Sequence, residues 1–109
     1  MAKYSVYREN TRNITLTFAG VDLTGATVFF TVKTEADDVA NDSTALIQKD
    51  VTTHLDATSG TTRIELTPED TDVAPGKYLY DIKLKKASGE QTTVDYGTFT
   101  IKPAITNRG

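Results

Sequence analysis

The residues best suited to acid–base, nucleophilic or metal chemistry are few in this sequence and stand far apart. There is one histidine, His54, and no cysteine, so a histidine pair and any thiolate nucleophile or metal ligand are excluded. No serine stands in a nucleophile-elbow pattern, and the glycines occur singly, without the spacing of a phosphate-binding loop. We therefore predict a protein that is not an enzyme, has no cofactor and carries His54 as a solvated strand residue.

Residues 35–44 form the segment that comes nearest to a cation-binding loop. Its acidic side chains are Glu35, Asp37, Asp38 and Asp42. Ca²⁺ prefers clustered carboxylate and carbonyl oxygens, but these positions do not match the spacing of an EF-hand loop. The sequence therefore favours a solvated acidic loop, with calcium binding as the alternative.

Charge and hydropathy argue against several classes of partner. The net charge of −3 disfavours nucleic acid, because nucleic-acid-binding domains usually carry a clear basic excess. The small basic cluster of Lys83, Lys85 and Lys86 has Asp81 beside it, which indicates a solvated strand face. No apolar run reaches the ~20 residues of a membrane span, and the N-terminus has no signal-peptide pattern. We expect no membrane partner, and a protein that stays in the cytosol or leaves it inside a larger particle.

An alternation of apolar and polar side chains with a period of two runs through nearly the whole chain, which is rich in threonine. This pattern is typical of β-strands with one buried face. Residues 51–56 and 61–66 are expected to pair as a hairpin across residues 57–60. A β-bulge is predicted at Gly97, because the alternation changes phase there. The predicted strands are residues 13–18, 26–33, 45–49, 51–56, 61–66, 78–84 and 94–101, with a possible short strand at 4–7.

Seven or eight short strands at turn spacings of about 8–12 residues indicate an all-β antiparallel sandwich. One short helical turn is predicted at residues 68–71, with Thr67 as its cap, and a type II turn at residues 74–77. We predict a single domain over residues 1–109, a length that suits one sandwich core.

The residues after the predicted helical turn favour an immunoglobulin-like sandwich. Asp72, Gly76 and Tyr78 stand in the arrangement of a tyrosine corner, in which a hydroxyl near the start of a strand reaches back to the preceding backbone. The alternative is that Tyr78 is simply a core tyrosine on an alternating strand. In both cases its role is stability.

Several longer segments together carry a family resemblance. They are residues 22–28 (DLTGATV), 45–49 (ALIQK), 60–71 (GTTRIELTPEDT), 75–82 (PGKYLYDI) and 96–103 (YGTFTIKP). They resemble the immunoglobulin-like N-terminal domain of phage baseplate upper proteins and of related phage and prophage tail proteins. The resemblance implies a virion structural role, in which such domains dock onto other tail or baseplate proteins, usually in symmetric multimers.

Candidate partner contacts lie in the two terminal segments and on one strand face. Residues 1–9 contain Tyr4, Tyr7 and Arg8, and tyrosine and arginine are enriched at binding hot spots. This segment is either a docking segment or an ordinary first strand. Phe29 interrupts the polar side of its strand, so it is either covered by a neighbour or exposed for a partner. Ile105 is the only apolar anchor of the tail at residues 104–109.

The predicted function is that of a structural or assembly module of a tailed-phage virion: a tail, baseplate, collar or decoration protein. The expected partners are other virion proteins, with a homo-oligomer or symmetric multimer in the particle. The expected location is the virion, assembled in the cytoplasm of the bacterial host. The alternative is a carbohydrate-binding or adhesin-type domain on the same fold, which the lack of tryptophan makes weaker.

Overall fold

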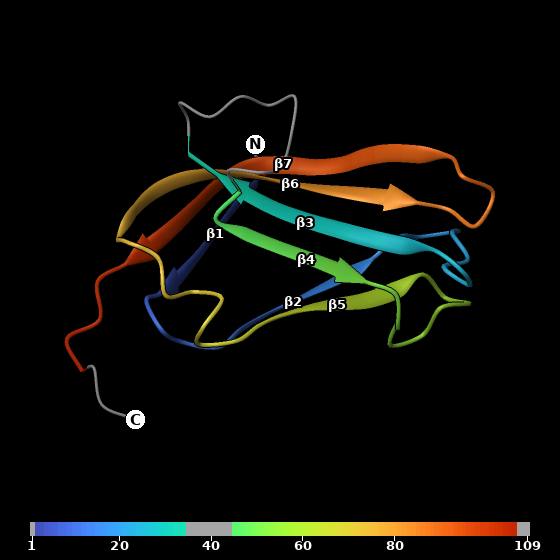
Figure 1. Ribbon diagram of the computed structural model, residues 1–109. Coiled ribbons are helices and arrows are strands. Elements are labelled where there is room, and N and C mark those ends of the chain that lie inside the picture. The colour runs from blue at the N-terminus through green and yellow to red at the C-terminus, as the bar shows by residue number, and fades with distance from the viewer. Residues whose placement is uncertain (1, 35–44, 107–109) are drawn as a thin grey trace.

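The computed structural model describes residues 2–34 and 45–106, which form a sandwich of two β-sheets (Figure 1). The prediction of an all-β immunoglobulin-like sandwich is confirmed. The acidic segment 35–44, and with it the calcium alternative, lies outside the described residues. The strands are β1 (Ala2–Tyr7), β2 (Arg12–Thr17), β3 (Thr27–Lys33), β4 (Ile47–Val51), β5 (Thr61–Leu66), β6 (Gly76–Lys85) and β7 (Gln91–Lys102).

The two sheets are unequal in width. One has five strands in the order β1-β7-β6-β3-β4, and the other pairs β2 with β5. β1 runs parallel to β7, and the other strand pairs are antiparallel. The predicted hairpin between residues 51–56 and 61–66 is wrong, because the chain crosses from one layer to the other between β4 and β5. Only Asp56 and Thr61 form an isolated bridge there.

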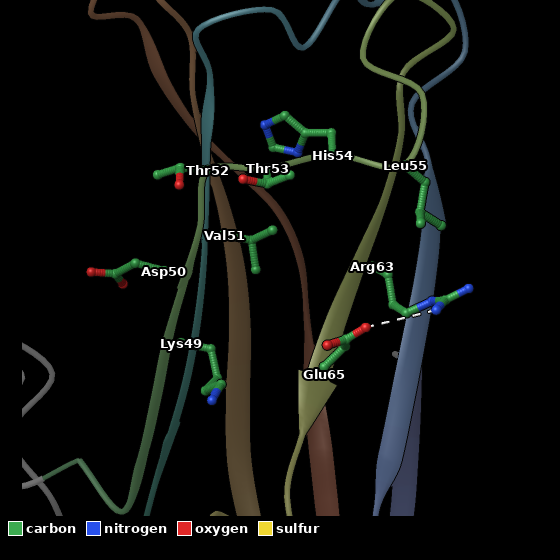
Figure 2. A pocket seen from close by; sticks show the side chains of 9 residues that line it. All are labelled: Lys49, Asp50, Val51, Thr52, Thr53, His54, Leu55, Arg63 and Glu65. Carbon is green, nitrogen blue, oxygen red and sulfur yellow. Dashed lines mark ion pairs between the residues drawn. The ribbon is translucent and has the colours of Figure 1, made fainter.

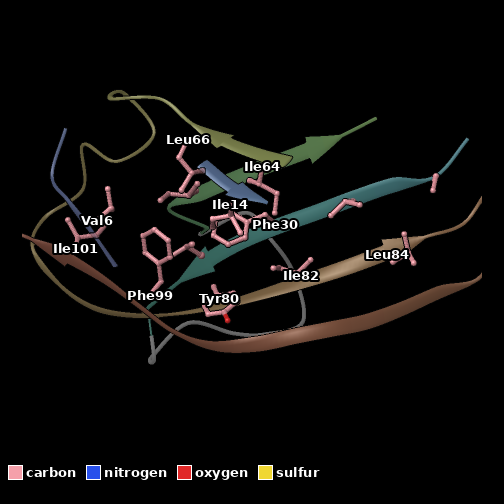
Figure 3. Packing of buried hydrophobic residues seen from close by; sticks show 14 of the residues in the cluster. Val6, Ile14, Phe30, Ile64, Leu66, Tyr80, Ile82, Leu84, Phe99 and Ile101 are labelled. Atoms are coloured by element: carbon pink, nitrogen blue, oxygen red, sulfur yellow. The ribbon is translucent and has the colours of Figure 1, made fainter. Parts of the chain in front are cut away.

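The core lies between the inner faces of the two sheets and is made of aliphatic and aromatic side chains (Figure 3). In β3, Val28, Phe30 and Val32 are fully buried, while the residues between them are half-buried. The centroid of the Phe30 ring lies 5.9 Å from that of Tyr80 and 5.8 Å from that of Phe99. Burying a side chain of this kind stabilises a fold by about 1.5–3 kcal/mol. The apolar positions of the period-two pattern are therefore also the side chains that stabilise the sandwich.

The β-bulge lies at Val94, so its predicted place at Gly97 is wrong. The register between β6 and β7 shifts at Ile82, which leaves Val94 without an opposite residue. Gly97 is buried on the inner face of β7, in regular register with Tyr80. The shift turns Asp95 inward, where its Oδ2 accepts a hydrogen bond of 3.0 Å from the Tyr80 hydroxyl. Burial and this bond to the carboxylate raise the pKa of Tyr80 well above its usual range.

The segment after β5 forms a turn, and the helical turn predicted at residues 68–71 is wrong. Within the described residues no helix occurs. The Thr71 N–H donates to the Thr67 carbonyl at 3.2 Å and the Asp72 N–H donates to the Glu69 carbonyl at 3.3 Å, so these residues form hydrogen-bonded turns. Thr67 does act as a cap, since its Oγ1 accepts from the Asp70 N–H at 3.3 Å. The buried Thr71 hydroxyl donates to the Asn10 carbonyl at 2.8 Å and ties the turn to the segment between β1 and β2.

The type II turn predicted at residues 74–77 is not formed either. Gly76 is the first residue of β6, and its φ of 158° is close to extended. Tyr78 lies two residues further, and its hydroxyl donates a hydrogen bond to the Ala74 carbonyl. The side chain therefore bridges the start of β6 back to the segment that precedes the strand.

Replacing Gly60 by alanine is expected to destabilise the protein by more than about 3 kcal/mol. Gly60 has a φ of +81°, and a Cβ there would collide with the carbonyl oxygens of Phe18 and Val21. The left-handed backbone costs an alanine ~1–2 kcal/mol, and the overpacking adds to it. Gly20→Ala is the matched control, because Gly20 has a φ of +76° with open space around it. Urea unfolding of both variants measures the difference, and equal losses would show that sterics at Gly60 are unimportant.

Removing the Tyr78 hydroxyl is expected to lower the free energy of unfolding by about 1 kcal/mol. Tyr78→Phe deletes the hydrogen bond to Ala74 and keeps the ring, and a typical intramolecular hydrogen bond contributes ~0.5–1.5 kcal/mol. Tyr96→Phe is the control, because Tyr96 is 65% exposed. Thermal unfolding followed by circular dichroism compares the two. An unchanged Tm in Tyr78→Phe would contradict a stabilising role for this bond.

Candidate docking surfaces

The solvent-facing side of the five-stranded sheet, here called the outer sheet face, collects apolar side chains from four strands. Tyr7 of β1, Phe29 of β3, Leu79 of β6 and Tyr96 of β7 all alternate with inward-facing neighbours. Tyr96 is 65% exposed, Tyr7 55% and Leu79 40%, whereas Phe29 is half-buried. The structure thus places two of the predicted contacts, Tyr7 and Phe29, on one face. Sequence alternation alone could have added Leu79 and Tyr96 to them.

Lysines stand between these apolar residues. Leu79 lies opposite Lys33 on β3, and Phe29 lies opposite Lys83 on β6. The Lys102 Nζ lies 5.3 Å from the centroid of the Tyr7 ring, a cation–π contact. The outer sheet face also carries Lys77 and Lys85, against Asp50 and Asp81 as its acidic residues. It is therefore basic, which the net charge of −3 conceals.

Tyr4 faces the interior of the sandwich, unlike Tyr7 on the same strand. It is half-buried, and its ring centroid lies 5.1 Å from that of Tyr80. The guanidinium carbon of Arg12 on β2 lies 5.7 Å from the Tyr4 centroid. Burial raises the pKa of the Tyr4 hydroxyl, and the charge of Asp95 raises it further, while Arg12 acts in the opposite direction. Tyr4 and Arg12 thus link the two sheets along the β1 margin.

β1 and β7, being parallel, finish side by side at one end of the sandwich (Figure 1). Arg8 follows β1 and its N–H donates to the Lys102 carbonyl at the end of β7, and Ile105 lies three residues after Lys102 in the chain. The Arg8 Nε donates to Asp72 Oδ1 at 3.0 Å, which joins a predicted contact to a residue of the predicted corner. Both side chains are largely exposed, and such pairs contribute only ~0–1 kcal/mol. Ile105 is 98% exposed. Arg8 therefore has an ion-pair partner at this end, whereas Ile105 is almost fully exposed.

An open hollow separates β4 from β5 along the other margin of the sandwich (Figure 2). Both strands are the last of their sheets on this side. On β5, Arg63 and Glu65 form an ion pair, with 3.7 Å between Nη1 and Oε1. The Lys49 Nζ lies 2.9 Å from the Asp70 Oδ2. The lining residues are Lys49, Asp50, Val51, Thr52, Thr53, His54, Leu55, Arg63 and Glu65.

His54 joins the two layers at the top of this hollow, so the expectation of a solvated histidine is wrong. Its Nε2 lies 2.9 Å from the Ala26 carbonyl oxygen and its Nδ1 lies 2.8 Å from the Thr62 Oγ1. Because a carbonyl oxygen only accepts, Nε2 carries the hydrogen. Thr62 is fully buried, so this bond satisfies a polar group inside the core. Residues 2–34 and 45–106 contain no group of three His, Cys, Asp or Glu side chains placed to hold a metal ion.

The comparison with protein families decides the assignment. The model of the BppU N-terminal domain matches residues 7–109. The chain belongs to this family, the N-terminal domains of phage baseplate upper proteins. The BppU N-terminal domain is a structural domain of the phage baseplate, so the resemblance seen in the sequence is confirmed. The match begins at Tyr7, the last residue of β1, and includes the whole of β2 to β7.

A solved structure supports the fold. The crystal structure of the PmoD soluble domain from Methylocystis sp. ATCC 49242 (Rockwell) superposes with a TM-score of 0.54 over 89% of this chain and 76% of that one. The two share 11% sequence identity, so the likeness concerns the fold alone. No curated protein sequence matches the chain. Across the described residues of this BppU N-terminal domain, no helix is long and apolar enough to cross a membrane.

Replacing Asp70 by asparagine is expected to lower the free energy of unfolding by about 1 kcal/mol near pH 7 and by much less near pH 3. Burial alone would raise the pKa of Asp70, but hydrogen bonds from Thr67 and from the Lys49 ammonium outweigh it and lower that pKa. A carboxyl group whose pKa is lowered by folding stabilises the fold above its unfolded pKa of ~3.9, and loses this effect as the pH falls through its folded pKa.

Urea unfolding at the two pH values measures this effect. Glu69→Gln is the control, since Glu69 is an exposed acid of the same turn. A loss in Asp70→Asn that is equal at both pH values would assign the effect to packing rather than to the charged pair with Lys49.

Proposed function

We propose that this domain is a non-enzymatic assembly module of a tailed-phage virion that docks onto other virion proteins through its outer sheet face. The match of residues 7–109 to the BppU N-terminal domain carries the proposal, because it makes the baseplate the expected place of action. Symmetric copies in one particle and assembly in the bacterial cytoplasm belong to the same proposal.

The composition of the outer sheet face supports this use. Tyr7 and Tyr96 offer large, rigid side chains with few rotamers to lose, which is why tyrosine is enriched at protein interfaces. Leu79 lies on the central strand β6, next to Lys33 and Thr98 in the register. The apolar groups are separated by lysines and threonines, so the face stays soluble when it is free. A surface built on five paired strands is also rigid, which lowers the entropy that docking must remove.

Immunogold microscopy tests the location directly. An antibody raised against the chain is expected to label the baseplate end of purified particles from cells that produce both the phage and this chain. Unlabelled particles, with the protein left free in the cytosol, would contradict the proposal. A glycan array run with the same purified chain tests the alternative of a carbohydrate-binding domain, and specific sugar binding would favour that alternative.

Docking through the outer sheet face is tested with the double substitution Leu79→Thr and Tyr96→Thr. Both residues are exposed and threonine suits a strand, so the Tm is expected to change by only a few degrees. The amount of chain in purified particles is expected to fall at least tenfold by quantitative immunoblotting. Leu55→Thr is the matched control, because Leu55 is 52% exposed but lies at the hollow. Equal incorporation of all three proteins would exclude the outer sheet face as the docking site.

A further inference from the structure

The two-stranded sheet has a free strand edge beside the hollow between the layers. Phe18 and Gly60 continue the register of β2 and β5, and the Phe18 N–H donates to the Gly60 carbonyl at 2.8 Å. Hydrogen-bonded and non-hydrogen-bonded pairs alternate along an antiparallel ladder. The even-numbered residues of β5 therefore bond to β2. The odd-numbered residues, Thr61, Arg63 and Glu65, direct their N–H and C=O groups to the free edge.

The chain itself occupies only the first position of this edge. The Thr61 N–H donates to the Asp56 carbonyl at 2.9 Å, and the Asp56 N–H donates to the Thr61 carbonyl at 3.0 Å. Over residues 2–34 and 45–106, no backbone group bonds the edge-facing N–H and C=O of Arg63 and Glu65. These groups are therefore available to a further strand, which would continue where the bridge at Asp56 ends.

The hollow gives such a strand room. It has a volume of about 430 Å³ and is lined by Arg63 and Glu65 on one side and by β4 on the other. Natural ligand pockets measure ~300–1,000 Å³. Val51 of β4 lies opposite the buried Val28, so it faces inward, yet it is only half-buried (Figure 2). Leu55 lines the same hollow and is 52% exposed. An apolar side chain bound there would shield both residues from water.

The charges at the edge define the chemistry of the segment that fits. Arg63 and Glu65 lie on the outer side of the two-stranded sheet, with 38% and 69% of their side chains exposed. The buried Nε of Arg63 has no hydrogen-bond partner within the described part of the chain, and the 3.7 Å contact with Glu65 is longer than a hydrogen bond. Side chains directly opposite on neighbouring strands interact, and opposite charges stabilise the pair. An acidic residue therefore fits opposite Arg63, and a basic residue fits opposite Glu65.

The residue between these two would lie opposite Ile64, which faces the core and is fully buried. That residue should be apolar, because it would face the hollow. Antiparallel pairing is slightly more stable per residue than parallel pairing. In that direction the matching segment reads basic, apolar, acidic.

We infer that the edge of β5 accepts an extended segment of another virion protein as a third, antiparallel strand of the small sheet. The segment presents a basic residue to Glu65, an apolar residue to the hollow and an acidic residue to Arg63. This site is separate from the outer sheet face. Only the origin of the segment in a virion protein rests on the proposed function.

A fused peptide tests whether the edge accepts a strand. The peptide TKVET is attached after Gly109 through a flexible linker of about 30 glycine and serine residues. Such a linker has a root-mean-square span of ~30 Å, comparable with the 32 Å extent of the domain. Amide hydrogen exchange measured by NMR is expected to slow at least twofold at Arg63 and Glu65, compared with the chain that carries the linker alone.

The matched control is the peptide TEVKT on the same linker, which has the same composition but brings like charges together in the antiparallel direction. Exchange at Arg63 and Glu65 that is not slowed by TKVET, or that is slowed equally by TEVKT, overturns the inference.

The variant Glu65→Pro tests the use of this edge in the particle. Proline removes an N–H that points away from β2, and edge strands tolerate it in that position, so the fold is expected to persist by circular dichroism. Glu65→Thr is the control, because it removes the same charge and keeps the N–H. Incorporation of Glu65→Pro into particles is expected to fall several-fold below that of Glu65→Thr.

Equal incorporation of the two variants would contradict the virion origin of the segment. The proposed function is judged separately, by the incorporation of Leu79→Thr/Tyr96→Thr. Loss of that double variant from particles, with Glu65→Pro incorporated like Glu65→Thr, would leave docking through the outer sheet face in place and remove the third strand.

Discussion

The structure depends on a mismatch of width, since the inner face of a five-stranded sheet is covered by a sheet of only two strands. Adjacent strands lie about 4.8 Å apart, so β2 and β5 cannot extend over both β1 and β4. Apolar packing around Phe30 closes the middle of the sandwich. The two margins must be closed by side chains long enough, or polar enough, to reach from one layer to the other.

Each margin meets this requirement with polar groups. Along β1, the Arg12 guanidinium lies over the Tyr4 ring, and within the described residues its buried Nε has no hydrogen-bond partner. Beyond the end of β4, His54 bonds Ala26, the residue before β3, and Thr62 of β5 in the other sheet. These contacts explain why the few ionisable residues near the core are structural. They hold the two layers in register.

The alternation of side chains predicted the strands well, because the buried residues of a strand occupy every second position of a short stretch of sequence. Pairing was harder to predict, since β5 follows β4 in the chain but pairs with β2, and nothing local distinguishes a crossing from a hairpin. The bulge was misplaced because Val94 and Tyr96 were taken to share one face, out of phase with Phe99 and Ile101, which put the phase change at Gly97. The inserted residue is Val94. Tyr7 and Phe29 were recognised by residue type, but only the sheet order puts them on one face.

The basic outer sheet face could not be found from the net charge, because a sum over the chain cancels opposite surfaces. Strand alternation separates the two roles of the sheet: Phe30 and Tyr80 face the core, while Phe29 and Leu79 face outward on the same strands. Surface residues can therefore change without loss of the core, which fits a fold shared with the PmoD soluble domain at 11% identity. Since the fold is common to such distant sequences, it does not specify a partner. The specificity of this domain must come from the pattern of lysine, tyrosine and leucine that the sheet holds rigidly in place.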